Sequence, residues 1–204
     1  FFPSYSYELH VVQQWKAIGL YKKIHERKKI YREPKLAGDV EKTLGIYSKN
    51  AATLNGAILL CVINGKMSEG INFSNDMARC VLVVGLPYPD ITNPELQEKM
   101  QLLDKNSREK NISISGQAYY QNLCMRAVNQ SIGRAIRHIN DFAAIILADV
   151  RYSTDPKVWD HLPVWLRGKD RPPRKMLLEG NIAGLKSFFA QHHFPQNKDT
   201  HKVI

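Results

Sequence analysis

The sequence lacks several features that would define its class at once. It has only three cysteines in 204 residues and no Cys-x-x-Cys pair, which excludes a four-cysteine cluster built from this chain alone. No apolar run reaches the length of a membrane span, and no secretory signal is visible. Acidic residues are scarce, since 19 Asp and Glu stand against 29 Lys and Arg and give a formal charge of +10. That excess favours polyanionic partners such as nucleic acid, although it also serves solubility.

The remaining composition is that of an ordinary globular protein. Hydrophobic residues make up 44% and charged residues 24%, which predicts one compact domain, or one domain with a tail. Cys61, Cys80 and Cys124 each lie among apolar neighbours, so we expect buried free thiols in a reducing compartment. Residues 1–4 resemble the end of a strand, which indicates that the chain is a piece of a longer protein.

The hydrophobic pattern predicts a layered α/β fold. Three continuously apolar runs, 57–63, 80–85 and 143–148, are typical of strands buried on both faces of a parallel sheet. Helices are expected over 4–18, from 39 through 47, and over 94–103, 117–138, 156–167 and 182–191. Strands that alternate with helices favour crossover units and a parallel sheet. The basic stretch 22–32 is either a solvated face or a phosphate-tracking surface, and 104–115 is expected to be a polar connection.

The loop after the first apolar run contains a Gly-Lys pair but is not a phosphate loop. A Walker-type loop needs G-x-x-x-x-G-K followed by Ser or Thr. Here Leu60 stands at the first glycine position and Met67 stands where the Ser or Thr would reach magnesium. No acidic strand end of the D-E-x-H kind follows. The chain therefore cannot build a complete ATPase site by itself.

The same loop is nevertheless suited to a ligand. Its small and polar residues are Gly65, Lys66, Ser68, Glu69, Gly70 and Asn72. Ligands of open α/β sheets bind beyond the carboxyl ends of the strands. The glycines permit close approach of the backbone, and the Lys, Ser and Asn supply donors suited to phosphate or ribose. The Glu is an acceptor for a water, a hydroxyl or an arginine, while the alternative interpretation is a structural turn with a solvent-facing lysine.

A second group of candidate residues precedes the third apolar run. Gln130, Arg134 and Arg137 are four and three residues apart, so they fall on one face if the segment is helical. Gly133 leaves the backbone open beside them. Two guanidinium groups on one face repel each other unless an anion or an acidic partner lies between them, which favours a γ-phosphate sensor or arginine finger. The alternative is a structural network with an acidic side chain, namely Asp141, Asp149 or Glu69.

These segments resemble motifs of the second motor domain of superfamily 2 helicases, specifically the XPD-like iron–sulfur DNA helicases. Residues 1–5 resemble motif IV, residues 65–73 with 79 and 85–89 resemble motif V and its sequel, and residues 130–137 with 141 and 149–152 resemble motif VI. The match covers roughly 1–167. Asn72 stands where an aspartate is more common, and together with residues 79–81 and 95–100 it is most similar to the ChlR-type branch, which is linked to sister-chromatid cohesion.

The resemblance implies a RecA-like domain over 1–167, followed by a basic linker and tail with a short helix over 168–204. It implies one motor domain of an ATP-driven helicase that moves 5′ to 3′ on single-stranded and forked DNA in the nucleus, acts in DNA repair, and works as a monomer with replication and cohesion proteins. ATP with Mg²⁺ would be shared with a first domain upstream, which would also carry the phosphate loop, the DEAH box and a 4Fe–4S domain. The fragment alone is expected to be inactive, and no metal ligand is expected in it.

The resemblance also assigns roles to single residues. Arg134 and Arg137 would contact the γ-phosphate, and Gln130 would position them or the attacking water. The expected ATP-side residues are Glu69, Gly70, Asn72 and Gly133, and the expected DNA contacts are Ser4, Tyr5, Lys66 and Ser68. A non-enzymatic basic nucleic-acid-binding domain is the alternative, and a scaffold module that binds proteins through its tail is a further one.

Overall fold

Parallel strand pairs form the centre of the structure, a computed structural model that describes residues 1–67, 71, 73, 77–110, 114–136, 141–167 and 178–192. Strand β1 (Lys29–Arg32) pairs with β2 (Ala57–Leu60), and β3 (Cys80–Val84) pairs with β4 (Ala144–Ala148). The predicted parallel α/β architecture is thereby confirmed. Strand β1 was not predicted, because its four residues begin and end with a basic side chain inside a charged stretch and show no apolar run.

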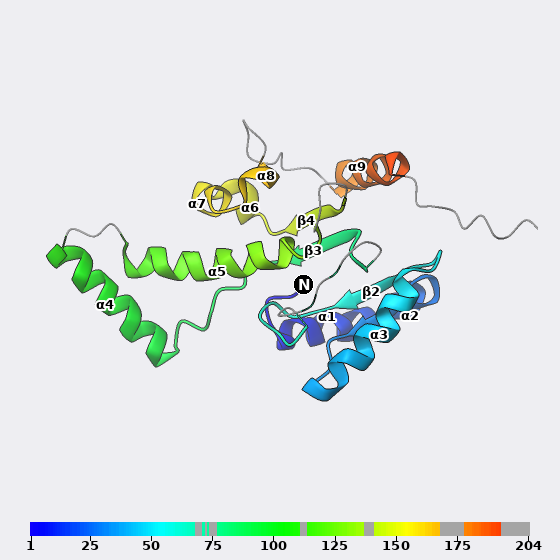
Figure 1. Cartoon of the computed structure of the whole chain (residues 1–204), viewed down its shortest axis with the longest axis horizontal. Helices are drawn as coiled ribbons and strands as arrows, with labels where there is room; N and C mark the ends of the chain where they lie inside the picture. Colours follow the sequence, from blue (N-terminus) through cyan, green and yellow to red (C-terminus); the bar gives the residue numbers. More distant parts are fainter. Residues whose placement is uncertain are drawn as a thin grey trace, which may run out of the picture.

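The first two residues join the strand pairs. The Phe2 amide donates to the Cys61 carbonyl at 2.9 Å, and the Val84 amide donates to the Phe1 carbonyl at 2.9 Å. The start of the chain therefore lies between the ends of β2 and β3, as Figure 1 shows at the label N. Phe2 forms an isolated parallel bridge with Val62, so the first residues pair with strand backbone without forming a strand of their own within the described residues.

Helices surround the two strand pairs. Figure 1 shows the first three helices beside β2, while the last four lie on the side of β3 and β4. The helices are α1 (Tyr5–Ala17), α2 (Leu20–Arg27), α3 (Val40–Ala51), α4 (Pro94–Lys110), α5 (Gly116–Ile132), α6 (Arg151–Thr154), α7 (Pro156–Asp160), α8 (Val164–Arg167) and α9 (Leu178–Gln191), with a 3₁₀ turn η1 (Ala37–Asp39) before α3. Of the helices in these described ranges, none is both long and apolar enough to cross a membrane.

Helices α4 and α5 form a hairpin that projects from the rest of the domain (Figure 1). The predicted polar connection over 104–115 was wrong for its first part, because α4 continues to Lys110. Lys, Arg and Glu favour helix on an exposed surface as well as apolar residues do. The Asp104 carboxylate accepts from the Gly116 amide at 2.7 Å, and a Cβ at Gly116 would lie 2.6 Å from the Met100 carbonyl oxygen. This close crossing fixes where α5 begins.

Two apolar clusters form the core. The larger one includes Val83, Val128 and Ile132, each with 0% exposure, and joins β3 to α5 and the later helices. The smaller one centres on Val12 of α1. The prediction that the strands are buried on both faces was wrong for β3, where Val83 is fully buried but Leu82 is 44% exposed. Helix α5 packs on one face, and alternate side chains of a strand point to opposite faces.

The same alternation decides the state of the cysteines. Cys61 and Cys124 are buried free thiols, as predicted, whereas Cys80 is exposed. Cys80 lies on the same side of β3 as Leu82, two residues away. The prediction of burial was therefore wrong for Cys80, because an apolar sequence neighbourhood does not show which face of the strand is covered.

Candidate functional site

The loop after β2 is anchored by its own backbone and by a buried side chain. Asn64 has a positive φ of 60°, and the Gly65 amide donates to the Val62 carbonyl at 2.9 Å. Asn is one of the few side chains that tolerates this left-handed backbone. Met67 has 0% exposure, so it secures the loop after the turn. Lys66 lies between these anchors and is exposed.

A carboxylate from the neighbouring strand holds this turn. Glu33 follows β1 directly, and its side chain accepts hydrogen bonds from the Val62 amide at 2.9 Å, from the Lys66 amide at 2.6 Å and from the Tyr5 hydroxyl. Hydrogen bonds to a charged acceptor are stronger than those between neutral groups. Glu33 was missed from the sequence because β1 was missed. An acidic residue at the carboxyl end of a parallel strand would have been the signal.

Gly65 is required because the Val62 backbone and the Glu33 carboxylate both approach it closely. A Cβ at this position would collide with the Glu33 carboxylate, with Oε2 at 2.7 Å, and would lie 2.8 Å from the Val62 carbonyl oxygen. Real Cβ contacts of this length are essentially never seen. The sequence predicted that Gly65 would let a ligand approach the backbone closely. In the structure, the group that approaches is the Glu33 carboxylate of the same chain.

Two of the predicted DNA contacts lie next to each other. The Lys66 ammonium nitrogen lies 5.6 Å from the centre of the Tyr5 ring, within the range of a cation–π contact. Burial, followed by the hydrogen bond to Glu33, raises the pKa of the Tyr5 hydroxyl above its usual value. Ser4 caps α1 instead, since its Oγ accepts from the Tyr7 amide at 3.2 Å. The structure therefore brings Tyr5 and Lys66 together and uses the Ser4 oxygen to begin the helix.

Arg134 reaches the far end of the same loop. Its Nη1 donates to the Ile71 carbonyl at 2.8 Å, and its Nε is buried and has no hydrogen-bond partner among the described residues. The predicted helical face is wrong at this point, because α5 ends at Ile132 and Arg134 lies in the following turn. Gly133 occupies the C-cap position, where its amide donates to Asn129. Glycine commonly ends a helix near this position.

Two of the three acidic residues considered as structural partners are engaged elsewhere. Asp141 forms a salt bridge with Arg79 at 2.6 Å, and Asp149 forms one with Arg151 at 2.7 Å. The bidentate contact with Arg151 is the main cause that lowers the pKa of Asp149 below its usual value. Arg134 makes no salt bridge with any residue in the described ranges. Among these residues, Arg134 is thus held by a backbone carbonyl.

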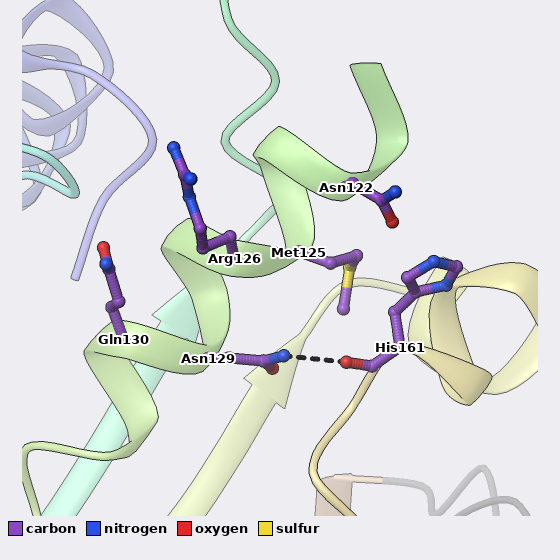
Figure 2. A pocket seen from close by; sticks show the side chains of 6 residues that line it. All are labelled: Asn122, Met125, Arg126, Asn129, Gln130 and His161. Atoms are coloured by element: carbon purple, nitrogen blue, oxygen red, sulfur yellow. Dashed lines mark hydrogen bonds between the residues drawn. The ribbon is translucent and has the colours of Figure 1, made fainter. Parts of the chain in front are cut away.

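Gln130 lies on the last turn of α5, beside an open hollow of about 450 Å³. Figure 2 shows Gln130 and Arg126 extending from one side of the helix, while Asn129 faces the loop that carries His161. The Asn129 amide nitrogen donates to the His161 carbonyl at 2.7 Å. Arg126, one turn before Gln130 and exposed, was not singled out from the sequence. The spacing of four residues from Gln130 was the signal that could have found it.

The ends of β3 and β4 are also tied together. The Tyr152 hydroxyl donates to the Gly85 carbonyl at 3.0 Å, and Gly85 has a left-handed φ of 68°. Burial raises the pKa of this tyrosine. Five further predicted site residues lie outside the described residues: Ser68, Glu69, Gly70, Asn72 and Arg137.

The fold and the loop after β2 define a parallel α/β domain in which an arginine, rather than a phosphate loop, lies at the strand-end loop. Among known families, the helicase C-terminal domain matches residues 1–169. The chain belongs to this family.

Relatives show which branch the chain resembles. It is 46% identical over 203 residues to the ATP-dependent DNA helicase DDX11 of Mus musculus, covering 96% of this chain and 22% of that protein. It is 48% identical over 174 residues to DDX11 of Danio rerio, covering 82% of this chain and 19% of that protein. It is 46% identical over 173 residues to the ATP-dependent DNA helicase CHL1 of Candida albicans, covering 82% of this chain and 20% of that protein. These proteins represent the ChlR-type branch expected from the motifs.

The solved structure of S. tokodaii Xpd4 is also similar, with a TM-score of 0.49 and 22% identity over 74% of this chain and 26% of that one. The chain spans about a fifth of the length of the curated relatives that it matches.

Proposed function

We propose that this chain is the second motor domain of a larger ATP-dependent DNA helicase that moves 5′ to 3′. The observation that carries this proposal is the position of Arg134, which is held at the strand-end loop by the Ile71 carbonyl. The relatives are named ATP-dependent DNA helicases, and their greater length leaves room for a first motor domain. The missing phosphate loop fits a domain that completes a nucleotide site without holding the nucleotide alone.

Arg134 acts as an arginine finger in this proposal. Arginine carries five N–H donors in a rigid fork, and Arg134 uses one of them on Ile71. The remaining donors can bind the γ-phosphate of ATP that the first domain holds with Mg²⁺. Arg137 is the second finger, and Gln130 positions the fingers or the attacking water. Glu69, Gly70, Asn72 and Gly133 form the rest of the nucleotide side.

The DNA side of the same loop begins at Lys66. Lys66 and Tyr5 contact the strand, and Ser4 and Ser68 are proposed as further contacts. The exposed position of Lys66 and Tyr5 and the formal charge of +10 support binding to a phosphate backbone. A lysine and an aromatic ring are typical of binding to single strands without sequence preference.

The two sides are connected through one loop. Glu33 holds its first part, and Arg134 holds it at Ile71. When ATP is present, the fingers draw the two motor domains together, and hydrolysis removes the phosphate contact and lets them part. A strand gripped at Lys66 is then moved relative to the first domain.

The wider setting follows from the family. We propose residues 1–167 as the motor domain and 168–204 as a basic linker and tail. Among the described residues, none form a group of three or more His, Cys, Asp or Glu side chains that could hold a metal. The proposed 4Fe–4S domain is assigned to another part of the protein, because such a cluster needs four thiolates and this chain has three cysteines. We further propose that the whole protein is a nuclear monomer. It would act in DNA repair on forked DNA, together with replication and cohesion proteins.

The test uses Arg134→Ala and Arg134→Lys in the full-length protein. We expect DNA-stimulated ATP turnover to fall by roughly 10³- to 10⁵-fold in the alanine variant, as with other arginine fingers. The lysine variant should recover little, since a single ammonium cannot replace the fork. Arg108→Ala, an exposed arginine on α4, is the matched control and should keep normal turnover.

Equilibrium binding to single-stranded DNA should change by less than about twofold in Arg134→Ala, because its role is on the nucleotide side. Near-normal turnover in that variant would contradict the assignment. Salt-sensitive DNA binding that ATP does not change in the wild-type protein would favour the non-enzymatic alternative. The isolated chain should show no turnover above a blank.

A further inference from the structure

Glu33 belongs to none of the segments assigned to nucleotide or DNA. Nevertheless, three hydrogen-bond donors at the site donate to its carboxylate. The amides of Val62 and Lys66 donate to its two oxygens at 2.9 and 2.6 Å, and the Tyr5 hydroxyl donates to Oε1. Gly65 has no side chain at the point where a Cβ would strike this carboxylate. The three contacts therefore join the start of α1, the end of β1 and the loop after β2.

The charge of Glu33 is balanced by hydrogen bonds alone within the part of the chain that the structure describes. None of the described basic side chains forms a salt bridge with it. The ammonium of Lys66, whose own amide donates to Glu33, is placed over the Tyr5 ring instead. A half-buried carboxylate that is satisfied by N–H and O–H groups holds these groups firmly in position.

These contacts decide what the site can offer to a nucleic-acid strand. The Lys66 amide and the Tyr5 hydroxyl are already used by Glu33, so neither is available to a phosphate oxygen. The Lys66 ammonium and the Tyr5 ring are left, and Tyr5 is 45% exposed. Attraction between an ammonium and a phosphate, together with stacking of a base on a ring, tolerates any sequence.

We infer that Glu33 is a positioning residue for DNA, whose carboxylate holds the Tyr5 ring and the Lys66 ammonium as one strand-binding unit. This inference rests on the proposed DNA-binding function of the same edge. Removing the negative charge of Glu33 should therefore weaken DNA binding. Simple electrostatics predicts the opposite, because one negative charge fewer near a polyanion strengthens attraction.

A competing interpretation is that Glu33 imitates a DNA phosphate and blocks its site. The donors around it, two amides and a hydroxyl, are of the kind that bind phosphate. In that case the strand would have to displace Glu33, and neutralising the residue would strengthen binding. The sign of the change in DNA affinity therefore separates the two interpretations.

The experiment compares Glu33→Gln with Glu26→Gln in the full-length protein. Glutamine keeps the shape of the side chain and removes its charge. Glu26 is the matched control, because it lies on the exposed surface of α2 with only a 4.0 Å pair to Lys22. Binding to a fluorescent single-stranded oligonucleotide is measured by anisotropy without nucleotide, and ATP turnover is measured over a range of DNA and ATP concentrations.

We expect Glu33→Gln to raise the dissociation constant for DNA roughly tenfold, and the DNA concentration for half-maximal stimulation by the same factor. The KM for ATP and kcat at saturating DNA should stay within about twofold of wild type. Glu26→Gln should bind DNA as tightly as wild type or slightly more tightly.

Tyr5→Phe provides a second variant that keeps the ring and removes only the hydroxyl donor. It should weaken DNA binding in the same direction, and the double variant should lose less than the sum of the two single losses, since both act through one hydrogen bond. Unchanged or tighter binding in both single variants, or a change in the KM for ATP as large as that for DNA, would overturn the inference.

The two proposals fail separately. Absence of DNA-stimulated hydrolysis in the wild-type protein would remove the proposed function, while the comparison of DNA affinities needs no hydrolysis and still tests Glu33. Normal hydrolysis together with unchanged DNA binding in Glu33→Gln and Tyr5→Phe would remove only the role of Glu33.

Discussion

The salt bridge between Glu8 and Arg32 offers a quantitative test of how α1 is held to β1. Arg32 Nε donates to Glu8 Oε1 at 2.7 Å and Nη2 donates to Oε2 at 2.5 Å. The pair lies beside the candidate DNA site, since Glu8 is one turn after Ser4 and Arg32 precedes Glu33. The hydrogen bonds to Glu8 raise the pKa of Arg32, so the guanidinium is charged at every working pH.

The two partners differ in exposure, so removing one of them should cost more stability than removing the other. The Glu8 side chain is 7% exposed and the Arg32 side chain is 36% exposed. Arg32→Met leaves a carboxylate with almost no access to water, which should lower the free energy of unfolding by about 3–4 kcal/mol. Glu8→Gln keeps one acceptor and leaves an arginine that water can reach, so the loss should be about 1–2 kcal/mol.

A double variant sharpens the prediction. Glu8→Met with Arg32→Met removes both charges and should lose less than Arg32→Met alone, because no unpaired charge is left buried. Lys22→Met is the control, since its pair with Glu26 is 4.0 Å long with side chains 86% and 63% exposed. It should change stability by less than about 0.5 kcal/mol.

The assay is equilibrium unfolding in urea at constant pH, followed by tryptophan fluorescence. Trp15 is a suitable reporter because it packs against the core cluster that contains Val12 of α1. A larger loss in Glu8→Gln than in Arg32→Met, or a double variant less stable than both, would refute the reasoning from exposure.

Two further predictions concern the packing of the same chain. Gly65→Ala should lower the free energy of unfolding by about 1–3 kcal/mol, because its Cβ has no space beside the Val62 carbonyl. In Gly45→Ala, on α3, the added Cβ meets no atom within 4 Å. This variant should raise the free energy of unfolding by up to about 1 kcal/mol. Urea unfolding of the two variants decides between them, and equal effects would contradict the role given to Gly65. Burial raises the pKa of both Cys61 and Cys124 to about 12, so at pH 8 both are thiols and should react slowly with iodoacetamide. Exposed Cys80 should be labelled first when intact mass is followed with time, and all three cysteines should react in urea. A Cys124 that reacts as fast as Cys80 would contradict the protection by burial.

The fold was predictable where the pattern was strong. The apolar runs became β2, β3 and β4, and the helix expected over 4–18 is α1. Strand β1 could not be found, because four residues with charged ends become a strand only through pairing with β2. The extension of α4 to Lys110 was missed for a related reason, since polar residues can continue a helix as well as end one.

The candidate site was only partly predictable. Arg134 and the loop around Gly65 were singled out from residue type and spacing, and the structure joins Arg134 to that loop through Ile71. Their assumed arrangement on one helical face was wrong, because the helix ends before Arg134. The roles of Arg134, Arg137 and Gln130 toward ATP stay predictions.

Sequence by itself determined the family, the parallel α/β class and the choice of candidate phosphate-binding residues, since these depend on residue types at short spacing. Tertiary structure alone decided which of them meet. Tyr5 and Glu33 are 28 positions apart, and Arg134 and Ile71 are 63 apart. Such contacts depend on the order of the strands in the sheet and on where each strand ends. A sequence pattern reflects only residues that are near each other along the chain, so it does not specify the order of the strands.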